Sequence, residues 1–509
     1  MTTVARRFHD ETTHTPHSVR TSGHTLDWGN KPFPFKIYTD APAVALPRDV
    51  DVLALPTLQA LAAAAAPAPA LTLGALTAVL YYAAGVTKKK AYPGGGEVLF
   101  RAAASTGALY QTEVYVVAGA VEGLDAGLYH FCPGDFTLRR LRAGDVRAAL
   151  AAAAAEPGLA RRAATLVLSA IYWRNTWKYQ ARGYRHLFWD SGTMLANALA
   201  AGGALGLQPS IVTGFVDDAV NHLLGVDADR EAALELLPIG PEGGAAAPAG
   251  ELPALRLEVM PLSSEEVDYP ALRELHGASS LRSPDEVVAW RRGLALPPRA
   301  PAGPVTALAE PAADSRPLGE AIQRRGSTRR FGPTPLSAPE LSAALWAATR
   351  PVAADVPGGH VDLYVIVHAV DGVAPGAYAC WPGRGLELLR AGEFRREAAY
   401  LTLEQALGGD AAATLFFLAP LDAILAAGGE RGYRLANLEA GIAGGRAYLA
   451  AYGLGFGASG LTFYDADVVR FFSPHAEGRD AIFVTALGRS GSTAGGVLLS
   501  NPISPPRRS

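Results

Sequence analysis

The feature that most constrains this chain is an internal repeat with one fixed spacing. Three short motifs occur twice: Gly-x-Tyr at Gly127 and Gly376, Arg-Gly-Tyr-Arg at Arg182 and Arg431, and Leu-Gly at Leu205 and Leu454. Each second copy lies 249 residues after the first (376 − 127, 431 − 182 and 454 − 205). Several matches with a shared offset are difficult to obtain by chance, and so long a period indicates a duplicated domain rather than a solenoid. We therefore expect two halves of similar fold.

The composition along the chain divides it in the same way. Residues 1–50 form a polar, turn-rich arm, residues 51–295 the first domain, residues 296–317 a proline- and alanine-rich linker, and residues 318–509 the second domain. The 509 residues are 49% hydrophobic and 18% charged, which is typical of globular protein with large cores.

Helical and strand patterns alternate along both halves. Helical patterns cover residues 58–66, 72–85, 148–155 and 187–205, and strand patterns cover residues 113–117, 165–171 and 481–487. This interleaving predicts an α+β fold. The uncharged stretch from Ser191 to Val216 is long enough to cross a membrane, but Asn197 and Pro209 interrupt it, so we expect a buried helix there.

Charge and cysteine content exclude several classes of function. The net charge is −3 and the isoelectric point about 6.4, which gives no electrostatic basis for binding nucleic acid. Two cysteines, Cys132 and Cys380, do not make a disulfide framework and favour a reducing, cytoplasmic location. The histidines of the N-terminal arm match no standard zinc spacing, so we expect no metal site.

A cluster of arginines opens the second domain. Arg325, Ser327 and Arg329 fall within five residues, and guanidinium groups suit phosphate because they present several donors in a fixed fork. Ser337 and Glu340 then form a predicted capping box in front of an apolar helix. Taken alone, the cluster could equally be a solvated basic turn.

This arrangement resembles the start of the nitroreductase-like flavoproteins. Arg-x-Ser-x-Arg, Pro-Leu-Ser and Leu-Trp-Ala-Ala begin here at Arg325, Pro335 and Leu345. The resemblance implies a mainly antiparallel central sheet flanked by helices, and a motif that holds the phosphate and ring edge of FMN. Members of this family are usually two-fold dimers with flavin at the interface, so a tandem chain would form an intramolecular pseudo-dimer.

The same resemblance implies further FMN contacts. The loop around Gly460 and Leu461 would bring a backbone N–H to flavin N5, although Gly455-x-Gly457-x-x-Gly460 could also be a plain glycine-capped helix end. It is not a dinucleotide fingerprint, because a helix rather than a strand precedes it. Arg489 would add to the phosphate site. The small-residue loop at residues 101–110 would cross from the other half, with Ser105 and Gly107 matching the family.

The catalytic candidates are Lys178 and Tyr179. The segment from Trp177 to Arg185 resembles the part of SagB-type azoline dehydrogenases that carries an essential Lys-Tyr pair. A desolvated lysine can serve as a base, and a tyrosine can relay a proton or position a ring. A solvent-facing lysine beside a half-buried tyrosine is the ordinary alternative. At the matching positions the second half has Ala427 and Gly428 instead.

The resemblance therefore predicts an FMN-dependent dehydrogenase that oxidises thiazolines or oxazolines in a ribosomally made peptide to thiazoles or oxazoles. Oxygen would be the final electron acceptor, and a cyclodehydratase of the same pathway is a candidate partner. Two alternatives stay open: an NAD(P)H-dependent nitro- or quinone reductase, and a non-catalytic flavin-binding or scaffold subunit. Because the arginine motif occurs only in the second half and the small-residue loop only in the first, we expect one FMN per chain.

Overall fold

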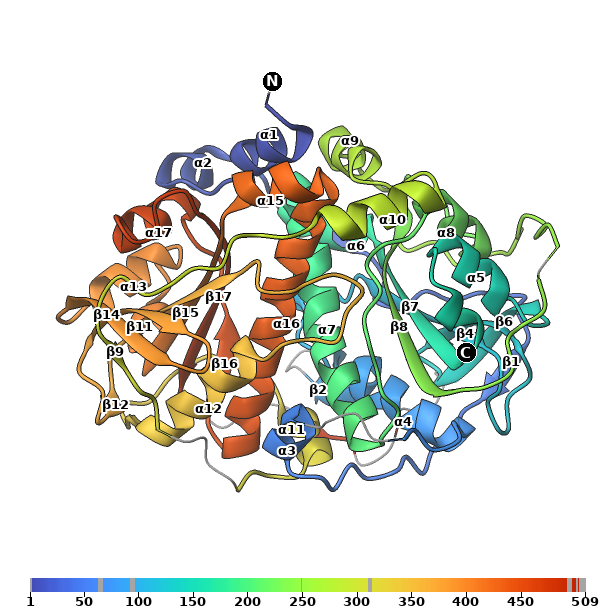
Figure 1. Cartoon of the computed structure of the whole chain (residues 1–509), viewed down its shortest axis with the longest axis horizontal. Coiled ribbons are helices and arrows are strands. Elements are labelled where there is room, and N and C mark those ends of the chain that lie inside the picture. Colours follow the sequence, from blue (N-terminus) through green and yellow to red (C-terminus); the bar gives the residue numbers. More distant parts are fainter. Residues whose placement is uncertain are drawn as a thin grey trace.

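A computed structural model contains two antiparallel sheets, one in each half, with two long helices side by side between them (Figure 1). It describes residues 2–62, 67–91, 97–248, 250–309, 314–491, 497–499 and 502. The predicted helix over 58–66 is observed as Thr57–Ala62, and its last four residues lie outside the described ones. The α+β class and the duplication are confirmed.

The sheet of the first half has six strands in the order β1-β6-β5-β4-β7-β8. All neighbours in it are antiparallel. The strands are β1 (Ala43–Ala45), β4 (Thr112–Ala118), β5 (Gly127–Cys132), β6 (Thr137–Ala143), β7 (Arg162–Ile171) and β8 (Glu231–Glu242). Strands β4, β5 and β7 are buried along almost their whole length, which is why they read as apolar, β-branched runs.

The sheet of the second half repeats this plan with seven antiparallel strands in the order β16-β17-β15-β11-β13-β14-β9. They are β9 (Val305–Thr306), β11 (Asp362–Val367), β13 (Gly376–Trp381), β14 (Gly385–Ala391), β15 (Ala413–Ala419), β16 (Gly457–Gly460) and β17 (Asp480–Gly488). Strand β9 comes from the predicted linker, which therefore adds an edge strand to the second sheet.

Two small sheets complete the strands. The pair β10 (Leu336–Ser337) and β12 (Val370–Asp371) is parallel. In the other, β2 (Val86–Ala91) pairs with β3 (Glu97–Arg101) and with β18 (Val497–Leu498). Because β18 follows the second sheet in sequence but pairs with β2, the end of the second half returns to the first half.

The helices lie on and between the sheets (Figure 1). Those up to the linker are α1 (Val4–Glu11), α2 (Pro16–Thr21), α3 (Thr57–Ala62), α4 (Leu73–Ala84), α5 (Arg147–Ala153), α6 (Tyr172–Tyr179), α7 (Gly183–Ala204), α8 (Asp217–Leu224), α9 (Pro270–Ala278) and α10 (Pro284–Gly293). Those of the second half are α11 (Leu318–Arg324), α12 (Ala338–Thr349), α13 (Arg395–Leu401), α14 (Ala406–Asp410), α15 (Leu421–Gly428), α16 (Arg431–Leu454) and α17 (Asp465–Phe472). The predicted capping box at Ser337 and Glu340 is present at the start of α12. No helix among the described residues is long and apolar enough to span a membrane.

Helices α7 and α16 form the contact between the halves. A Cβ built on Gly441 would lie 2.6 Å from the carbonyl oxygen of Trp189, and one built on Gly192 would lie 2.7 Å from the amide nitrogen of Ile442. The two glycines are 249 residues apart (441 − 192), so the repeat places one at the crossing point on each helix. Close backbone approach needs residues without a side chain there. The chain thus forms the expected intramolecular pseudo-dimer.

The repeated Arg-Gly-Tyr-Arg motif joins the halves through buried ion pairs. Arg182 and Arg185 of the first half bond Asp465 of the second, with N–O distances of 3.0 and 2.6 Å. Arg431 and Arg434 bond Asp217 of the first half in the same way, each at 2.6 Å. Each carboxylate is buried between two guanidinium groups, and these charges lower the pKa of Asp217 to about 2 against the effect of burial.

The N-terminal arm lies across the junction at the top of Figure 1, where α1 sits between α9 and α15. The backbone amides of Val4 and Ala5 donate to the carboxylate of Glu430, at 2.9 and 2.6 Å. His9 is buried, and burial together with nearby arginines lowers its pKa well below the usual value. The arm therefore belongs to the packed structure of both halves.

Candidate functional site

The arginine cluster of the second half meets the small-residue loop of the first half. Arg325 is buried, and its Nε donates to the carbonyl oxygen of Ala102 at 2.7 Å. Its Nη2 donates to the carbonyl oxygens of Arg101 and Ala103, at 2.8 and 3.1 Å. Among the described residues, Nη1 has no hydrogen-bond partner. Arg325 thus fixes the loop in place, and its Nη1 remains available to donate to another group.

Lys88 of the first half also lies against this cluster. It comes from β2, and its Nζ donates to the carbonyl oxygens of Arg324 and Arg325, at 2.6 and 2.7 Å. Burial, assisted by the charges of Arg325 and Arg324, lowers the pKa of Lys88 to about 8. The sequence analysis missed this residue because β2 lies more than 200 residues before the motif that it contacts.

Lys178 and Tyr179 end α6 and lie close to Arg329. The charge of Arg329 acts on both: it contributes, after burial, to a lowered pKa of Lys178, and it opposes the burial that raises the pKa of Tyr179. Lys31 of the N-terminal arm adds to the effect on Lys178. Neither Lys178 nor the exposed Arg329 has an ion-pair or hydrogen-bond partner among the described residues. The Nζ of Lys178 lies 5.3 Å from the ring centre of Tyr179.

The small-residue loop is held by one buried carboxylate, Asp190 of α7. Its Oδ2 accepts from the hydroxyl of Ser105 at 2.6 Å and from the amide of Thr106 at 2.8 Å. Gln111 donates to the same oxygen at 2.7 Å. Burial raises the pKa of Asp190 to about 6 in spite of these donors. Gln111 therefore ties the end of the loop to the same carboxylate that holds Ser105 and Thr106.

Gly107 brings this loop against Tyr179. Its φ is +64°, in the left-handed region that favours glycine, and a Cβ there would lie 3.0 Å from the tyrosine hydroxyl. The ring of Tyr179 also contacts His186 edge-on, with 4.4 Å between ring centres. His186 is buried, its Nδ1 lies 3.0 Å from the side-chain oxygen of Asn175, and its Nε2 has no partner. Sequence reasoning missed His186, which lies one residue after the repeated arginine motif.

The backbone amides of Gly460 and Leu461 are both engaged. Gly460 donates to the hydroxyl of Tyr448 at 2.5 Å, and Leu461 donates to the carbonyl oxygen of Val484 at 3.1 Å. The Tyr448 hydroxyl also lies 3.4 Å from that of Ser327. Tyr448, on α16, is therefore the group that meets Ser327 and the Gly460 amide. Gly455 ends α16 with φ +86°, as the helix-cap alternative requires.

Arg489 lies apart from this group of residues. It follows β17 and pairs with the capping-box carboxylate of Glu340 at the start of α12, with an N–O distance of 2.7 Å. The carboxylate of Glu340 is favourable at a helix start, and Arg489 adds an ion pair to its hydrogen bonds with Ser337. In this structure Arg489 is thus tied to the helix cap.

The side chains present fit an anionic flavin cofactor. Two cations, Arg329 and Lys178, face the junction without an acidic partner among the described residues, and the hydroxyl of Ser327 and Nη1 of Arg325 lie on the same motif. Lys178 is half-buried and Arg329 is exposed, and a half-buried charge without a counter-charge is costly unless a ligand supplies one. No group of acidic, histidine or cysteine side chains among the described residues could hold a metal ion.

The fold and this junction define a class: a tandem α+β protein in which the arginine cluster of the second half contacts the small-residue loop of the first. The particular family follows from comparison. The family model described as "Nitroreductase family" matches residues 51–240 and 322–486, one match in each half. The chain therefore belongs to the nitroreductase family, in tandem form.

Three relatives support this assignment. A protein of Methanocaldococcus jannaschii named as a nitroreductase is 30% identical over 171 residues, which are 33% of this chain and 81% of that protein. Trifolitoxin-processing protein TfxB of Rhizobium leguminosarum bv. trifolii is 30% identical over 173 residues, 32% of this chain and 46% of that protein. The crystal structure of an Anabaena variabilis protein named as a nitroreductase matches with a TM-score of 0.76 and 26% identity, over 96% of this chain and 100% of that one. That likeness extends over both halves.

Proposed function

We propose that this protein is an FMN-dependent dehydrogenase that oxidises azoline rings in a ribosomally made peptide. The observation that carries the proposal is that Lys178 and Tyr179 from the first half lie near enough to Arg329 of the second half for its charge to act on both. The Lys-Tyr pair is the feature by which the chain resembles azoline dehydrogenases rather than simple reductases. The similarity to a protein whose name describes the processing of trifolitoxin supports a role in peptide modification.

FMN would be held mainly by the second half. Arg329, Ser327 and the free nitrogen of Arg325 would bind its phosphate and ring edge, and Lys88 adds positive charge beneath the same motif. Ser105 and Gly107 would cover it from the first half. The backbone amide of Gly460 would contact the ring after its hydrogen bond to the hydroxyl of Tyr448 breaks. Leu461 and Arg489 are weaker candidates because they are bonded to other groups. Bound FMN supplies the two-electron acceptor of the reaction.

Lys178 is the candidate general base. Oxidation of an azoline requires removal of a proton from a carbon beside the ring nitrogen, and a neutral amine can accept it. Burial and the charges of Arg329 and Lys31 all favour the neutral form, which is the direction that a base needs. Tyr179 stays protonated because its pKa is raised, so its hydroxyl can donate to the substrate or relay the proton.

The proposal is tested with a purified protein, a peptide that contains thiazoline, and oxygen. We expect a yellow protein whose flavin is released as FMN, and a product peptide that has lost two hydrogens per ring by mass spectrometry. A protein that leaves thiazoline unchanged but turns over NADH with a nitroarene would instead be a reductase. A colourless protein that binds a cyclodehydratase would be a scaffold subunit.

A further inference from the structure

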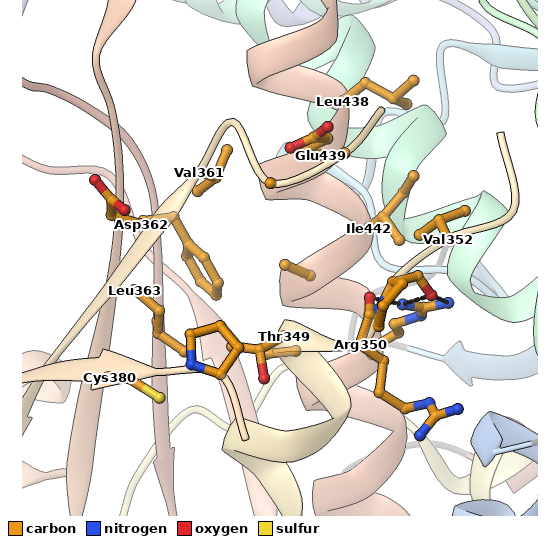
Figure 2. Close-up of a pocket in the computed structure, with 18 of the residues that line it drawn as sticks. Thr349, Arg350, Val352, Val361, Asp362, Leu363, Cys380, Leu438, Glu439 and Ile442 are labelled. Atoms are coloured by element: carbon orange, nitrogen blue, oxygen red, sulfur yellow. Dashed lines mark hydrogen bonds between the residues drawn. The ribbon is translucent and has the colours of Figure 1, made fainter. Parts of the chain in front are cut away.

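The second half contains a cavity away from the Lys178–Arg329 junction. A cavity of about 450 Å³ lies between α16, the sheet of the second half and the segment of residues 350–361 (Figure 2). Its walls include Leu435, Glu439, Ile442 and Arg446 from one face of α16. None of the residues at the Lys178–Arg329 junction lines it.

The repeat identifies this cavity as the counterpart of the candidate flavin site. Glu439 lies 249 residues after Asp190 (439 − 190), and like Asp190 it anchors a neighbouring segment by hydrogen bonds. Its Oε2 accepts from the amide of His360 at 2.8 Å and its Oε1 lies 2.6 Å from the ring Nδ1 of that histidine. Asp190 anchors the loop of the first half, and Glu439 anchors the shorter segment that replaces this loop in the second half.

The chemistry of the first site was not retained here. Ala427 and Gly428 stand where Lys178 and Tyr179 stand in the first half, and Ile211 stands where Gly460 stands in the second half (460 − 249). The side chain of Ile211 lines the cavity. An isoleucine cannot allow the close backbone approach to a flavin that a glycine allows. The space persisted while the groups for flavin chemistry were replaced.

Two arginines give one end of the cavity an unbalanced positive charge. Arg446 is 7% exposed, its Nη1 donates to the carbonyl oxygen of Arg350 at 2.6 Å, and its buried Nε has no partner among the described residues. The guanidinium of Arg350 lies 4.7 Å from the ring centre of Trp346. Neither arginine has an acidic partner among the described residues. A buried donor and two like charges are costly unless an anion joins them.

The two acids that line the cavity, Asp362 and Glu439, already have hydrogen-bond partners. Asp362 pairs with Arg299 at 2.7 Å, and Glu439 pairs with His360. The rest of the wall that Figure 2 shows is largely apolar, including Val352, Val361, Leu363, Leu438 and Ile442. The cavity therefore combines an apolar body with one cationic end, and its size lies in the range of sites for small molecules.

We propose that this cavity is a binding site for a small organic carboxylate with an apolar body, held at its charged end by Arg446 and Arg350. A carboxylate fits because it brings a negative charge to two arginines that line the cavity and have no acidic partner among the described residues. The apolar body would cover Val352, Val361 and Ile442. This site is separate from the proposed flavin site, so the proposal does not depend on the function argued above.

The test uses two probes of equal shape, 2-naphthoate and its neutral amide, in calorimetric titrations of the protein as purified. We expect the carboxylate to bind and the amide to bind roughly tenfold more weakly, because hydrogen bonds to a charged partner are lost. Arg446→Met should weaken the binding of the carboxylate by a similar factor. Val352→Trp, which fills the cavity, should abolish binding of both probes. Arg396→Met, on exposed α13, is the matched control and should change nothing.

Three results would overturn the proposal. The first is that the protein binds 2-naphthoate and its amide with equal affinity. The second is that both Arg446→Met and Val352→Trp bind 2-naphthoate as tightly as the wild type. The third is that a second equivalent of FMN binds and competes with 2-naphthoate. If Arg446→Met does not fold, Arg350→Met takes its place, since Arg350 is only partly buried and donates no hydrogen bond by its side chain. The flavin content of each variant is measured alongside and should stay unchanged.

Discussion

At the scale of single residues, the account depends on Lys178 acting as a base. Lys178→Ala should leave the protein yellow and slow azoline oxidation by about 10²–10⁴-fold, the usual cost of losing a general base. Lys178→Arg keeps the positive charge but cannot give up its proton, so it should be equally slow. Tyr179→Phe removes only the hydroxyl. The measurement is flavin reduction by the peptide in the absence of oxygen, and full activity of Lys178→Arg would exclude the base assignment.

Arg329 and Arg325 should differ in what they contribute. Arg329 is exposed and unpaired among the described residues, so Arg329→Ala should weaken FMN by about 1.5–3 kcal/mol with little effect on folding. Arg325→Ala removes three hydrogen bonds to the loop as well, so it should also lower the free energy of unfolding. Fluorescence titration of the apoprotein measures the affinity, and wild-type affinity in both variants would show that this motif does not hold FMN.

Glu235 predicts a pH dependence of stability that is independent of catalysis. Burial raises its pKa from 4.5 to about 8, although Ser191 donates to Oε1 at 3.0 Å and Arg434 and Arg431 favour the charged form. Its Oε2 has no partner. Because the folded pKa is the higher one, the contribution is fully present below pH 4.5 and is lost as pH rises through 8.

The corresponding variant is Glu235→Gln, which keeps an acceptor for Ser191 and cannot ionise. Between about pH 4.5 and about pH 8, the free energy of unfolding of the wild type should fall by up to about 1.4 kcal/mol per pH unit more than that of the variant. Urea denaturation at several pH values measures the difference. Parallel curves for the two proteins would show that Glu235 does not titrate in this range.

At the scale of elements, the crossing of α7 and α16 is the contact most sensitive to a small change. In Gly441→Ala the new Cβ would lie 2.6 Å from the carbonyl oxygen of Trp189, so helix backbone rather than a side chain must move. Overpacking of this kind costs about 1–3 kcal/mol. Gly277→Ala, in α9, has no atom within 4 Å of its Cβ and should be neutral or stabilising by up to about 1 kcal/mol. Equal unfolding midpoints for the two variants would contradict this account of the junction.

Sequence patterns predicted single helices and strands better than other features of the structure. The helix over 72–85 is observed as Leu73–Ala84 with Thr72 as its cap, because the cap and the apolar run are both local signals. The strand over 113–117 is observed as Thr112–Ala118, because its apolar run is also a local signal. The helix over 148–155 ends at Ala153, ahead of Pro157. Local chemistry decides these positions, so a single sequence is enough to predict them.

Contacts between distant residues could not be predicted in this way. The anchoring of the loop by Asp190, the position of Lys88 under the arginine motif and the bond from Gly460 to Tyr448 each depend on how the halves pack. The motif residue Arg489 pairs with Glu340 because α12 begins beside the end of β17, which no local pattern reveals. Asp190 and Glu439 share the offset of the repeat, but only the packed structure shows that each anchors a neighbouring loop segment.

At the scale of the whole molecule, duplication followed by divergence would account for the two different sites that we propose. The first half contributes Lys178, Tyr179 and the covering loop, and the second half contributes Arg325, Ser327 and Arg329. At the mirror position these groups are absent among the described residues, and a cavity with Arg350 and Arg446 remains. A phosphate dianion needs several charge-assisted donors, which the first site has and the second has in smaller number. One chain should therefore form one flavin site.

The ratio of flavin to polypeptide tests this central claim most directly. It is obtained from the absorbance of released flavin against amino-acid analysis, after the protein has been saturated with FMN and freed of excess. The account predicts a ratio near one, and a ratio near one also in Ile442→Phe, which narrows the second cavity. A ratio near two in the wild type, reduced to one by Ile442→Phe, would show that both halves bind flavin and would contradict the account.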